Sequence, residues 1–378
     1  MKTIALLTLS CIPNYGAQLQ TYATNFVFKR QIKKKGYDIK FEVFNFEPLV
    51  QKSRYSKKAA IAQTIRSVGI KNKAVCFYRL LKIKQTEAYD LHQKLLPFQC
   101  SYGLYDNSNK KLIEEYDGYV IGSDQTWNPE LLEDNTLLLN TIKSEHKYSY
   151  AASFGLDTLP SKYKDQYVEA LDKFKYISVR EDVGFKILQT IMPKKNNYTQ
   201  VLDPTLLMTA KEWSSIESGR VVNEEYILLY LAKPSDALLQ FARLKANEMR
   251  VKLYIISTPD MKMIRNNPNY LGTVSPNQFI SLIHHSESAV TNSFHGIAFS
   301  VIFEKNFYTQ YNDPAVTKTN SRIKSILTIL HLENRLITDA GLDNTDIDYV
   351  GVNAILENNR MLSIDYINKV LDDIGGIK

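Results

Sequence analysis

The sequence predicts an α/β protein with two Rossmann-like, doubly wound domains that face a cleft. Apolar runs of strand length alternate with helix-period segments almost from end to end, as in parallel sheets covered by helices. A length of 378 residues is enough for two domains with ordinary hydrophobic cores. The alternation pauses at Asp203-Pro204 and then restarts, so we expect domains over residues 1–205 and 206–350.

Five apolar segments predict the strands of the first half. Residues 3–9 form an apolar run typical of a buried strand, whereas residues 39–46 alternate between apolar and polar side chains. The predicted strands are 3–9, 39–46, 119–121, 147–152 and 176–179, and the predicted helices are 18–34 and 182–190.

The second half repeats this pattern. Pro276 suits the first turn of a helix, where its missing N–H leaves no hydrogen bond unmade. The segment 351–378 contains a last helix, over 353–373, that we expect to pack back on the first domain. The predicted strands are 226–231, 253–257, 288–292 and 307–310, and the other helices are 235–250, 296–303 and one that begins at Pro276.

Composition excludes several classes of protein. No segment approaches the roughly 18–20 consecutive apolar residues of a membrane span. The 3 cysteines are widely spaced and form neither a disulfide framework nor a CxxC motif, which favours a reducing compartment. The apolar run after Lys2 is shorter than the roughly 7–15 residues of a signal-peptide core. We therefore expect a cytoplasmic protein.

The formal charge of +7 is concentrated in one insert, over about residues 50–98, where two helices are predicted at 57–68 and 73–96. Without that insert's cations the chain is slightly acidic, so we expect no nucleic-acid partner. The insert suits an anionic membrane surface, at the inner face of the cytoplasmic membrane, or is a solvated helical segment. Its cations are Lys52, Arg54, Lys57, Lys58, Arg66, Lys71, Lys73, Arg79, Lys82 and Lys84.

Polar clusters at the ends of predicted strands are the candidate functional residues. Asn14 and Gly16 begin a helix after the first strand, where free N–H groups can bind an anion, although a plain turn has the same pattern. Arg180 ends another strand and can bind a phosphate or carboxylate, or instead pair with Glu181 or Asp182.

The segment 122–128 follows a third strand and is rich in groups that bind sugars. Its polar side chains can hydrogen-bond hydroxyls while Trp127 stacks on a sugar face. Alternatively, Asp124 caps a helix and Trp127 lies in the core. The candidate acceptor-binding residues are Ser123, Gln125, Trp127 and Asn128.

His295 is the candidate catalytic residue. Of the 6 histidines, it is the one in a strand–turn–helix junction with a glycine after it. A helix N-terminus favours neutral imidazole, and histidine exchanges protons near neutral pH. The alternative is a structural histidine. The sequence contains no Walker loop, no GxGxxG after the first strand, no HExxH and no DxD pair, so we expect no metal ion and no nucleotide cofactor.

In their order and spacing, these motifs resemble the polysaccharide pyruvyltransferase family. The resemblance covers most of residues 1–335 and leaves out the basic insert and the C-terminal segment. The motifs are Asn14-Tyr-Gly-Ala, Gly122-Ser-Asp-Gln with Trp127-Asn128, Tyr150-Ala-Ala-Ser-Phe-Gly, Ser178-Val-Arg-Glu, Leu202-Asp-Pro-Thr, Ser275-Pro with Phe279, Thr291-Asn-Ser-Phe-His-Gly and Asn320-Ser-Arg.

The resemblance implies a GT-B-like fold and transfer of a pyruvyl group from phosphoenolpyruvate to a sugar diol, as a cyclic ketal. The acceptor would be a surface polysaccharide, such as a capsule or exopolysaccharide, or its lipid-linked precursor. His295 would be the general acid, Asp124 would orient or deprotonate the attacking hydroxyl, and Arg180 would bind the donor. The other implied donor-binding residues are Lys305, Ser293, Asn292, Asn14 and Gly16.

One position departs from the family pattern. Many members have arginine two residues before the histidine, where this chain has Ser293. The cation that replaces it would come from Arg180, Lys305, Lys233 or Arg322. Two other functions remain open: a glycosyltransferase with a nucleotide-sugar donor on the same scaffold, and a non-catalytic glycan-binding protein.

Overall fold

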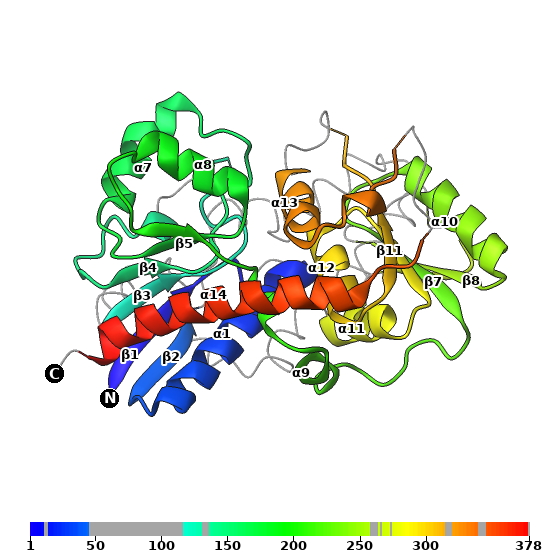
Figure 1. Cartoon of the computed structure of the whole chain (residues 1–378), viewed down its shortest axis with the longest axis horizontal. Coiled ribbons are helices and arrows are strands. Elements are labelled where there is room, and N and C mark those ends of the chain that lie inside the picture. The colour runs from blue at the N-terminus through cyan, green and yellow to red at the C-terminus, as the bar shows by residue number, and fades with distance from the viewer. Residues whose placement is uncertain are drawn as a thin grey trace, which may run out of the picture.

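The computed structural model describes residues 1–10, 14–44, 116–130, 136–257, 264, 267–272, 274–313, 320–338 and 345–376. These residues form two α/β domains, each built around a parallel sheet (Figure 1). The two helices predicted at 57–68 and 73–96, and the basic surface proposed for the insert, lie outside the described residues. No helix among the described residues is long and apolar enough to cross a membrane.

The first domain contains a parallel sheet in the order β2-β1-β3-β4. Bridges from Tyr148 to Tyr176 and from Ala152 to Val179 connect this sheet to the β5-β6 pair. The strands are β1 (Lys2–Leu7), β2 (Ile39–Phe44), β3 (Gly118–Ile121), β4 (Lys147–Ser149), β5 (Ile177–Val179) and β6 (Tyr198–Gln200). The helices are α1 (Tyr15–Lys35), α7 (Lys164–Leu171) and α8 (Asp182–Ile191), with short 3-10 turns at Thr136–Leu138, Ser161–Tyr163 and Pro204–Leu207.

The second domain contains a parallel sheet in the order β11-β10-β7-β8-β9. Its central strand β7 is buried along its whole length, as expected for a sheet with helices on both faces. The strands are β7 (Tyr226–Leu231), β8 (Lys252–Ser257), β9 (Tyr270–Gly272), β10 (Ser288–Thr291) and β11 (Asn306–Thr309). The helices are α9 (Ala210–Ser214), α10 (Asp236–Met249), α11 (Pro276–His284), α12 (Phe294–Ile302) and α13 (Asn320–Leu330), with a 3-10 turn at Glu333–Arg335.

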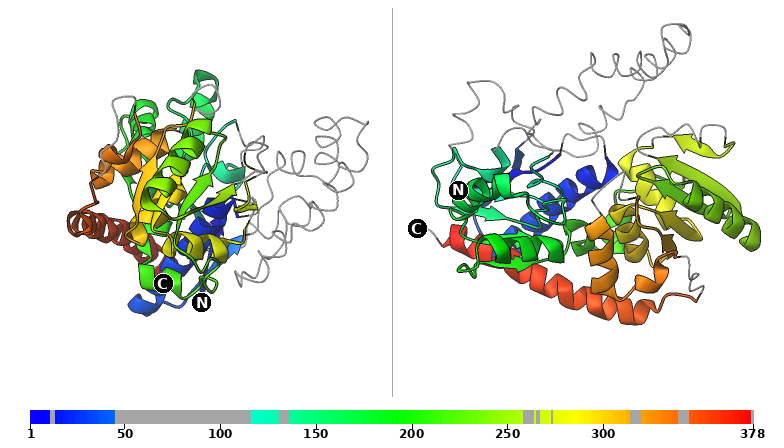
Figure 2. Two further views of the ribbon diagram at one scale, coloured as in Figure 1. Left: turned by 90° about the vertical axis from the view of Figure 1, so that its right-hand side faces the viewer. Right: turned by 90° about the horizontal axis from the view of Figure 1, so that it is seen from above.

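The last helix, α14 (Tyr349–Gly375), runs from the second domain back along the first (Figures 1 and 2). Near its start, the Tyr349 hydroxyl donates to the carbonyl of Lys305 at 2.6 Å. Further along, the Tyr366 hydroxyl donates to the carbonyl of Ser149 at 2.7 Å, and Asp373 pairs with Tyr148 and Lys175. The helix therefore connects both domains by direct contacts.

The predicted fold, an α/β protein with two doubly wound parallel sheets, is confirmed. Strand β7 has the predicted bounds, and each of the other predicted strands overlaps an observed one, whereas β6 and β9 were not predicted. The strand predicted at 147–152 is too long, because β4 ends at Ser149. The reason is Ala151, whose φ of 55° lies in the left-handed region and breaks the extended backbone.

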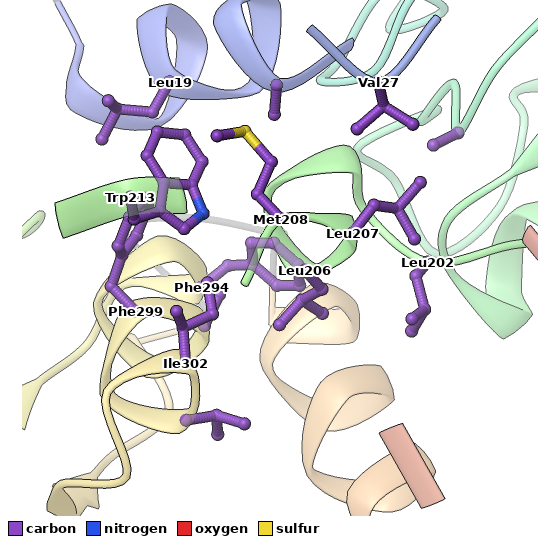
Figure 3. Close-up of a cluster of buried hydrophobic side chains, with 14 of the residues drawn as sticks. Leu19, Val27, Leu202, Leu206, Leu207, Met208, Trp213, Phe294, Phe299 and Ile302 are labelled. Carbon is purple, nitrogen blue, oxygen red and sulfur yellow. The ribbon is translucent and has the colours of Figure 1, made fainter. Parts of the chain in front are cut away.

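One hydrophobic cluster extends across both domains (Figure 3). Trp213 is fully buried at its centre, and its indole N–H donates to the carbonyl of Thr205 at 3.1 Å. Leu19 of α1 and Met208 belong to the same buried cluster as this indole, and Phe299 of α12 packs edge-on at 4.9 Å between ring centroids. Burial of apolar surface at this junction fixes α12 relative to α1.

Replacing Trp213 by alanine should lower the free energy of unfolding by about 3–5 kcal/mol, because it leaves a large cavity in a packed core. Urea denaturation followed by circular dichroism measures this loss. Leu244→Ala is the matched control, since Leu244 is 70% exposed on α10 and its truncation should change stability by about 0.5 kcal/mol or less. Equal losses in the two variants would contradict this role for Trp213.

Candidate active site

Loops that follow parallel strands bring their polar residues together between the two domains. In the first domain, Asp124 follows β3, Arg180 follows β5 and Asp203 follows β6. In the second domain, His295 lies in the first turn of α12, after β10. Doubly wound sheets bind ligands beyond the carboxyl ends of their strands. The candidate active site is therefore at this junction of the two domains.

Arg180 is at the centre of the cluster, with a side chain only 1% exposed. Its guanidinium donates to Asp203 Oδ2 at 2.8 Å, and to Asp124 Oδ1 and Glu181 Oε2 at 3.3 Å each. Its Cζ lies over the ring of Phe294, 5.0 Å from the centroid. Burial lowers the pKa of Arg180, but the three carboxylates outweigh burial and raise it overall. Arg180 thus forms the expected alternative pair with Glu181, together with two pairs to Asp124 and Asp203 that were not expected, whereas Asp182 pairs with Lys186 instead.

Ser123 and Asp124 form a tight turn that aims both side chains at this cluster. The Ser123 hydroxyl donates to Asp203 Oδ2 at 2.9 Å. Asp124 has a φ of 74°, in the left-handed region that aspartate tolerates better than most residues. Its backbone oxygen accepts hydrogen bonds from the N–H groups of Thr126 and Ser153, at 2.7 and 3.0 Å. The backbone therefore holds the Asp124 carboxylate in place against Arg180.

Asp203 is buried, yet it is held in its ionised form. Its side chain caps the 3-10 turn that follows, because Oδ1 accepts from the N–H and the hydroxyl of Thr205 at 3.0 and 2.7 Å. Burial raises the pKa of Asp203, but His295, Arg180 and the hydrogen bonds from Thr205 outweigh burial and hold the pKa below its usual range. Asp203 is thus a fixed negative charge beside His295.

His295 is buried without a hydrogen bond to its Nε2 atom among the described residues. Nε2 lies 3.9 Å from Asp203 Oδ2, beyond hydrogen-bond distance. Burial lowers the pKa of His295 to about 4, with Arg180 and Arg322 acting in the same direction and Asp203 opposing them. The imidazole is therefore neutral at neutral pH, and it is placed to accept one proton.

Gly16 and Asn14 place the N-terminus of α1 directly against His295. A Cβ atom at Gly16 would lie 1.9 Å from His295 Nδ1, so only glycine allows this approach. The Asn14 side chain caps α1 by accepting from the N–H of Ala17 at 3.2 Å. Ser293 caps α12 in the same way, accepting from the N–H of Gly296 at 3.4 Å. Two helix N-termini, both favourable to anions, therefore meet at the imidazole.

Arg322, in the first turn of α13, completes the cluster. Its Nη1 lies 3.8 Å from Asp124 Oδ1, and its Nε is buried without a partner among the described residues. Burial and Arg180 lower the pKa of Arg322 overall, although the neighbouring carboxylates act in the opposite direction. With neutral His295, three carboxylates face two guanidiniums, so the cluster has an excess of one negative charge.

The structure corrects the expected role of Trp127. Its indole is fully buried, packs against Phe154 and Phe174, and donates to the carbonyl of Leu137 at 3.1 Å. Trp127 is therefore a core residue that cannot stack on a sugar. Asn128 Nδ2 donates to Gln125 Oε1 at 2.8 Å, which joins these two predicted acceptor residues to each other.

The prediction that Lys305 binds the donor is also wrong. It directly precedes β11, so it lies at the amino end of the second sheet, whereas His295 follows the carboxyl end of the neighbouring β10. Asn292 has a structural contact as well. Its amide oxygen accepts from the N–H of Ala232 at 2.9 Å, and its amide nitrogen donates to the carbonyl of Lys233 at 2.9 Å. Lys305 is thus excluded as a donor ligand, and Asn292 holds the loop after β7.

Two members of the cluster were not among the predicted site residues. Asp203 was interpreted as a domain boundary because a proline follows it, and Glu181 was considered only as a partner of Arg180. For Glu181 the available signal was its position just after the apolar strand β5, the same signal that identified Arg180. Asp203 follows the polar strand β6, Tyr-Thr-Gln, and lacked that signal.

The model of the polysaccharide pyruvyl transferase family matches residues 14–314, which include most of both domains and every cluster residue except Arg322. The chain belongs to the polysaccharide pyruvyl transferase family. A comparison with curated proteins gives no match.

This pyruvyl transferase family member is similar to solved structures of other enzymes. A UDP-N-acetylglucosamine 2-epimerase is 10% identical with a TM-score of 0.51, and the alignment covers 100% of this chain and 97% of the epimerase. The corresponding enzyme from Neisseria meningitidis, bound to UDP-GlcNAc, is 10% identical with a TM-score of 0.49, covering 100% and 95%. Escherichia coli ADP-heptose LPS heptosyltransferase II is 10% identical with a TM-score of 0.38, covering 95% and 99%. The fold is of the GT-B type.

Gly16→Ala should displace His295 and lower stability by about 1–3 kcal/mol, because the added methyl group overlaps the imidazole. Gly219→Ala is the matched control: a Cβ there meets nothing within 4 Å, and we expect a change of about 0.5 kcal/mol or less. Urea denaturation of both variants measures the difference. If Gly16→Ala were as stable as the wild type, the close packing of α1 on His295 would be wrong.

His295 should make stability fall as the pH falls from about 6.5 toward 4. Because its folded pKa is about 4 and its unfolded pKa about 6.5, the unfolded chain binds more protons in that window. The loss should reach about 2–3 kcal/mol by pH 4.5 and level off below pH 4.

The control for this effect is His295→Gln, which cannot titrate. Unfolding free energies of both proteins from urea denaturation, at several pH values between 7 and 4.5, give the contribution of His295 by difference. A difference between wild type and variant that stays constant across this range would contradict the lowered pKa.

Proposed function

We propose that this protein transfers the pyruvyl group of phosphoenolpyruvate to two hydroxyls of a sugar, forming a cyclic ketal, with His295 as the general acid. The acceptor is a glycan of a surface polysaccharide or its lipid-linked precursor. The observation that supports this most directly is the buried, unpartnered Nε2 of His295 where two helix N-termini meet. Family membership supports the reaction class.

Binding of the donor would switch His295 into its acidic form. The phosphate and carboxylate of phosphoenolpyruvate bring negative charge next to the imidazole, and a nearby opposite charge raises the pKa of a histidine. Asp203, at 3.9 Å from Nε2, then stabilises the imidazolium. The low pKa of the free protein is thus compatible with acid catalysis, because protonation of His295 and donor binding favour each other.

Anion binding in an already negative cluster requires donors that are not yet used. The guanidinium of Arg180 already pairs with three carboxylates, so Arg180 is a weak candidate for binding a further anion. Arg322 has a buried Nε without a partner among the described residues, and the α1 and α12 N-termini offer backbone N–H groups. We therefore assign donor binding to Arg322 and these helix ends, in place of the family arginine that Ser293 replaces.

The chemical steps follow from this arrangement. His295 protonates the methylene carbon of phosphoenolpyruvate, which becomes the methyl group and leaves an oxocarbenium-like centre at the adjacent carbon. One sugar hydroxyl attacks that carbon, the bond to the phosphate oxygen breaks, and the second hydroxyl closes the ketal. Of the two hydroxyl protons, one restores His295 and the other leaves with phosphate. Asp124, held by Arg180, orients the attacking hydroxyl.

His295→Gln should reduce phosphate release from phosphoenolpyruvate, in the presence of a glycan acceptor, by about 10²–10⁴-fold, the usual contribution of a general acid. His331→Asn is the control, since His331 is exposed and its positive φ of 55° suits asparagine. Mass spectrometry of the glycan for a pyruvyl ketal identifies the product.

The same preparations distinguish this function from a glycosyltransferase. Phosphoenolpyruvate should raise the melting temperature, whereas a nucleoside diphosphate should not. Stabilisation by the nucleoside diphosphate alone would contradict the proposal, and so would a wild-type rate in His295→Gln.

A further inference from the structure

Glu217, His284 and His285 form a second polar cluster, far along the sheet from the active site. His284 is the last residue of α11 and His285 follows it, while Glu217 lies in the loop after α9. Just after this pair, the backbone N–H of Glu287 donates to the carbonyl of Tyr226, at the start of β7. The cluster is therefore at the amino end of the second sheet, whereas His295 is at the carboxyl end, and pyruvyl transfer does not use it.

The three side chains converge as ligands of a metal ion do. His284 Nδ1 lies 2.9 Å from Glu217 Oε2, and His285 Nε2 lies 3.6 Å from Glu217 Oε1. One potential ligand atom from each residue lies within 4.8 Å of those of the other two. Metal–ligand bonds of about 2.0–2.2 Å to imidazole nitrogen and carboxylate oxygen fit inside such a triangle.

Adjacent helical residues normally point in different directions, but these two histidines do not. His285 leaves the helix, with φ −98° and ψ 4°, which brings its ring to within 4.6 Å of the His284 ring, centroid to centroid. The His284 ring also stacks on Phe303, at 4.3 Å and 17°. Packing thus orients one of the imidazoles before any ion binds.

The loop that contains Glu217 is fixed on α11 by three hydrogen bonds. The amide nitrogen of Asn277 donates to the carbonyl of Ile216 at 2.7 Å, and the N–H of Ser218 donates to the carbonyl of Asn277 at 3.2 Å. The Ser281 hydroxyl donates to the carbonyl of Gly219 at 3.2 Å. The carboxylate is therefore held beside the helix end by its own backbone.

We propose that Glu217, His284 and His285 bind a divalent transition-metal ion, with Zn²⁺ as the representative, through two imidazoles and one carboxylate. Imidazole suits zinc, copper and nickel, whereas calcium and magnesium require oxygen ligands. The side chains are 33%, 29% and 15% exposed for His284, His285 and Glu217, which leaves a fourth position to water. The ion fastens the loop after α9 to the end of α11.

Isothermal titration of the full-length, chelator-treated protein with Zn²⁺ alone tests this site. We expect one saturable site that Glu217→Gln and His284→Ala each weaken by about tenfold or more. His331→Asn, which changes an exposed histidine elsewhere, should keep wild-type affinity. Zn²⁺ should also raise the melting temperature of the wild type but not of the two site variants.

Glu217→Gln keeps the shape of the side chain and one acceptor oxygen, so it remains informative if His284→Ala does not fold, as circular dichroism will show. The proposal is overturned if the wild type shows no saturable Zn²⁺ binding below about 100 μM, a free energy of roughly 5.5 kcal/mol. It is equally overturned if Glu217→Gln binds Zn²⁺ as tightly as the wild type, since the ligands would then lie elsewhere. Neither result depends on whether phosphoenolpyruvate is the donor.

Discussion

The ion pair between Arg180 and Asp203 is the interaction on which the rest of the active site depends. Neither side chain is more than 1% exposed, and burying either charge without its partner would be strongly unfavourable. The pair therefore forms only when the loops after β5 and β6 come together. Asp203 also caps the turn that leads into the second domain, and it faces His295. One buried carboxylate thus links the position of the arginine to that of the proposed acid.

The charges around His295 explain how a histidine can be both buried and ready to accept a proton. Burial alone favours the neutral ring, and the two arginines add to this effect. Asp203 and Asp124 oppose them, so the protonated ring is disfavoured but not isolated. We propose that an anionic ligand shifts this balance toward the protonated ring, because a nearby negative charge raises the pKa of a histidine and low solvent exposure strengthens the Coulombic interaction.

The sequence predicted the sheets well, because buried parallel strands are continuous apolar runs, as in β7. It predicted less well which way a side chain faces at the end of a strand. Trp127 and Asp124 are three residues apart in one polar segment, yet one lies in the core and the other in the site. Lys305 was chosen for its charge, but its place before β11 puts it at the wrong end of the sheet. The contact between Gly16 and His295 joins two domains, and no local pattern predicts such a contact.

The exposures within the cluster indicate from which side a ligand approaches. Asp203, Arg180 and Glu181 have side chains no more than 2% exposed, and that of His295 is 7% exposed. Asp124 and Arg322 reach 12% and 17%. The most exposed of these side chains are therefore Asp124, after β3, and Arg322, in the first turn of α13. We propose that a donor enters on this side, so that Arg322, whose Nε has no partner among the described residues, is the first cation that it meets.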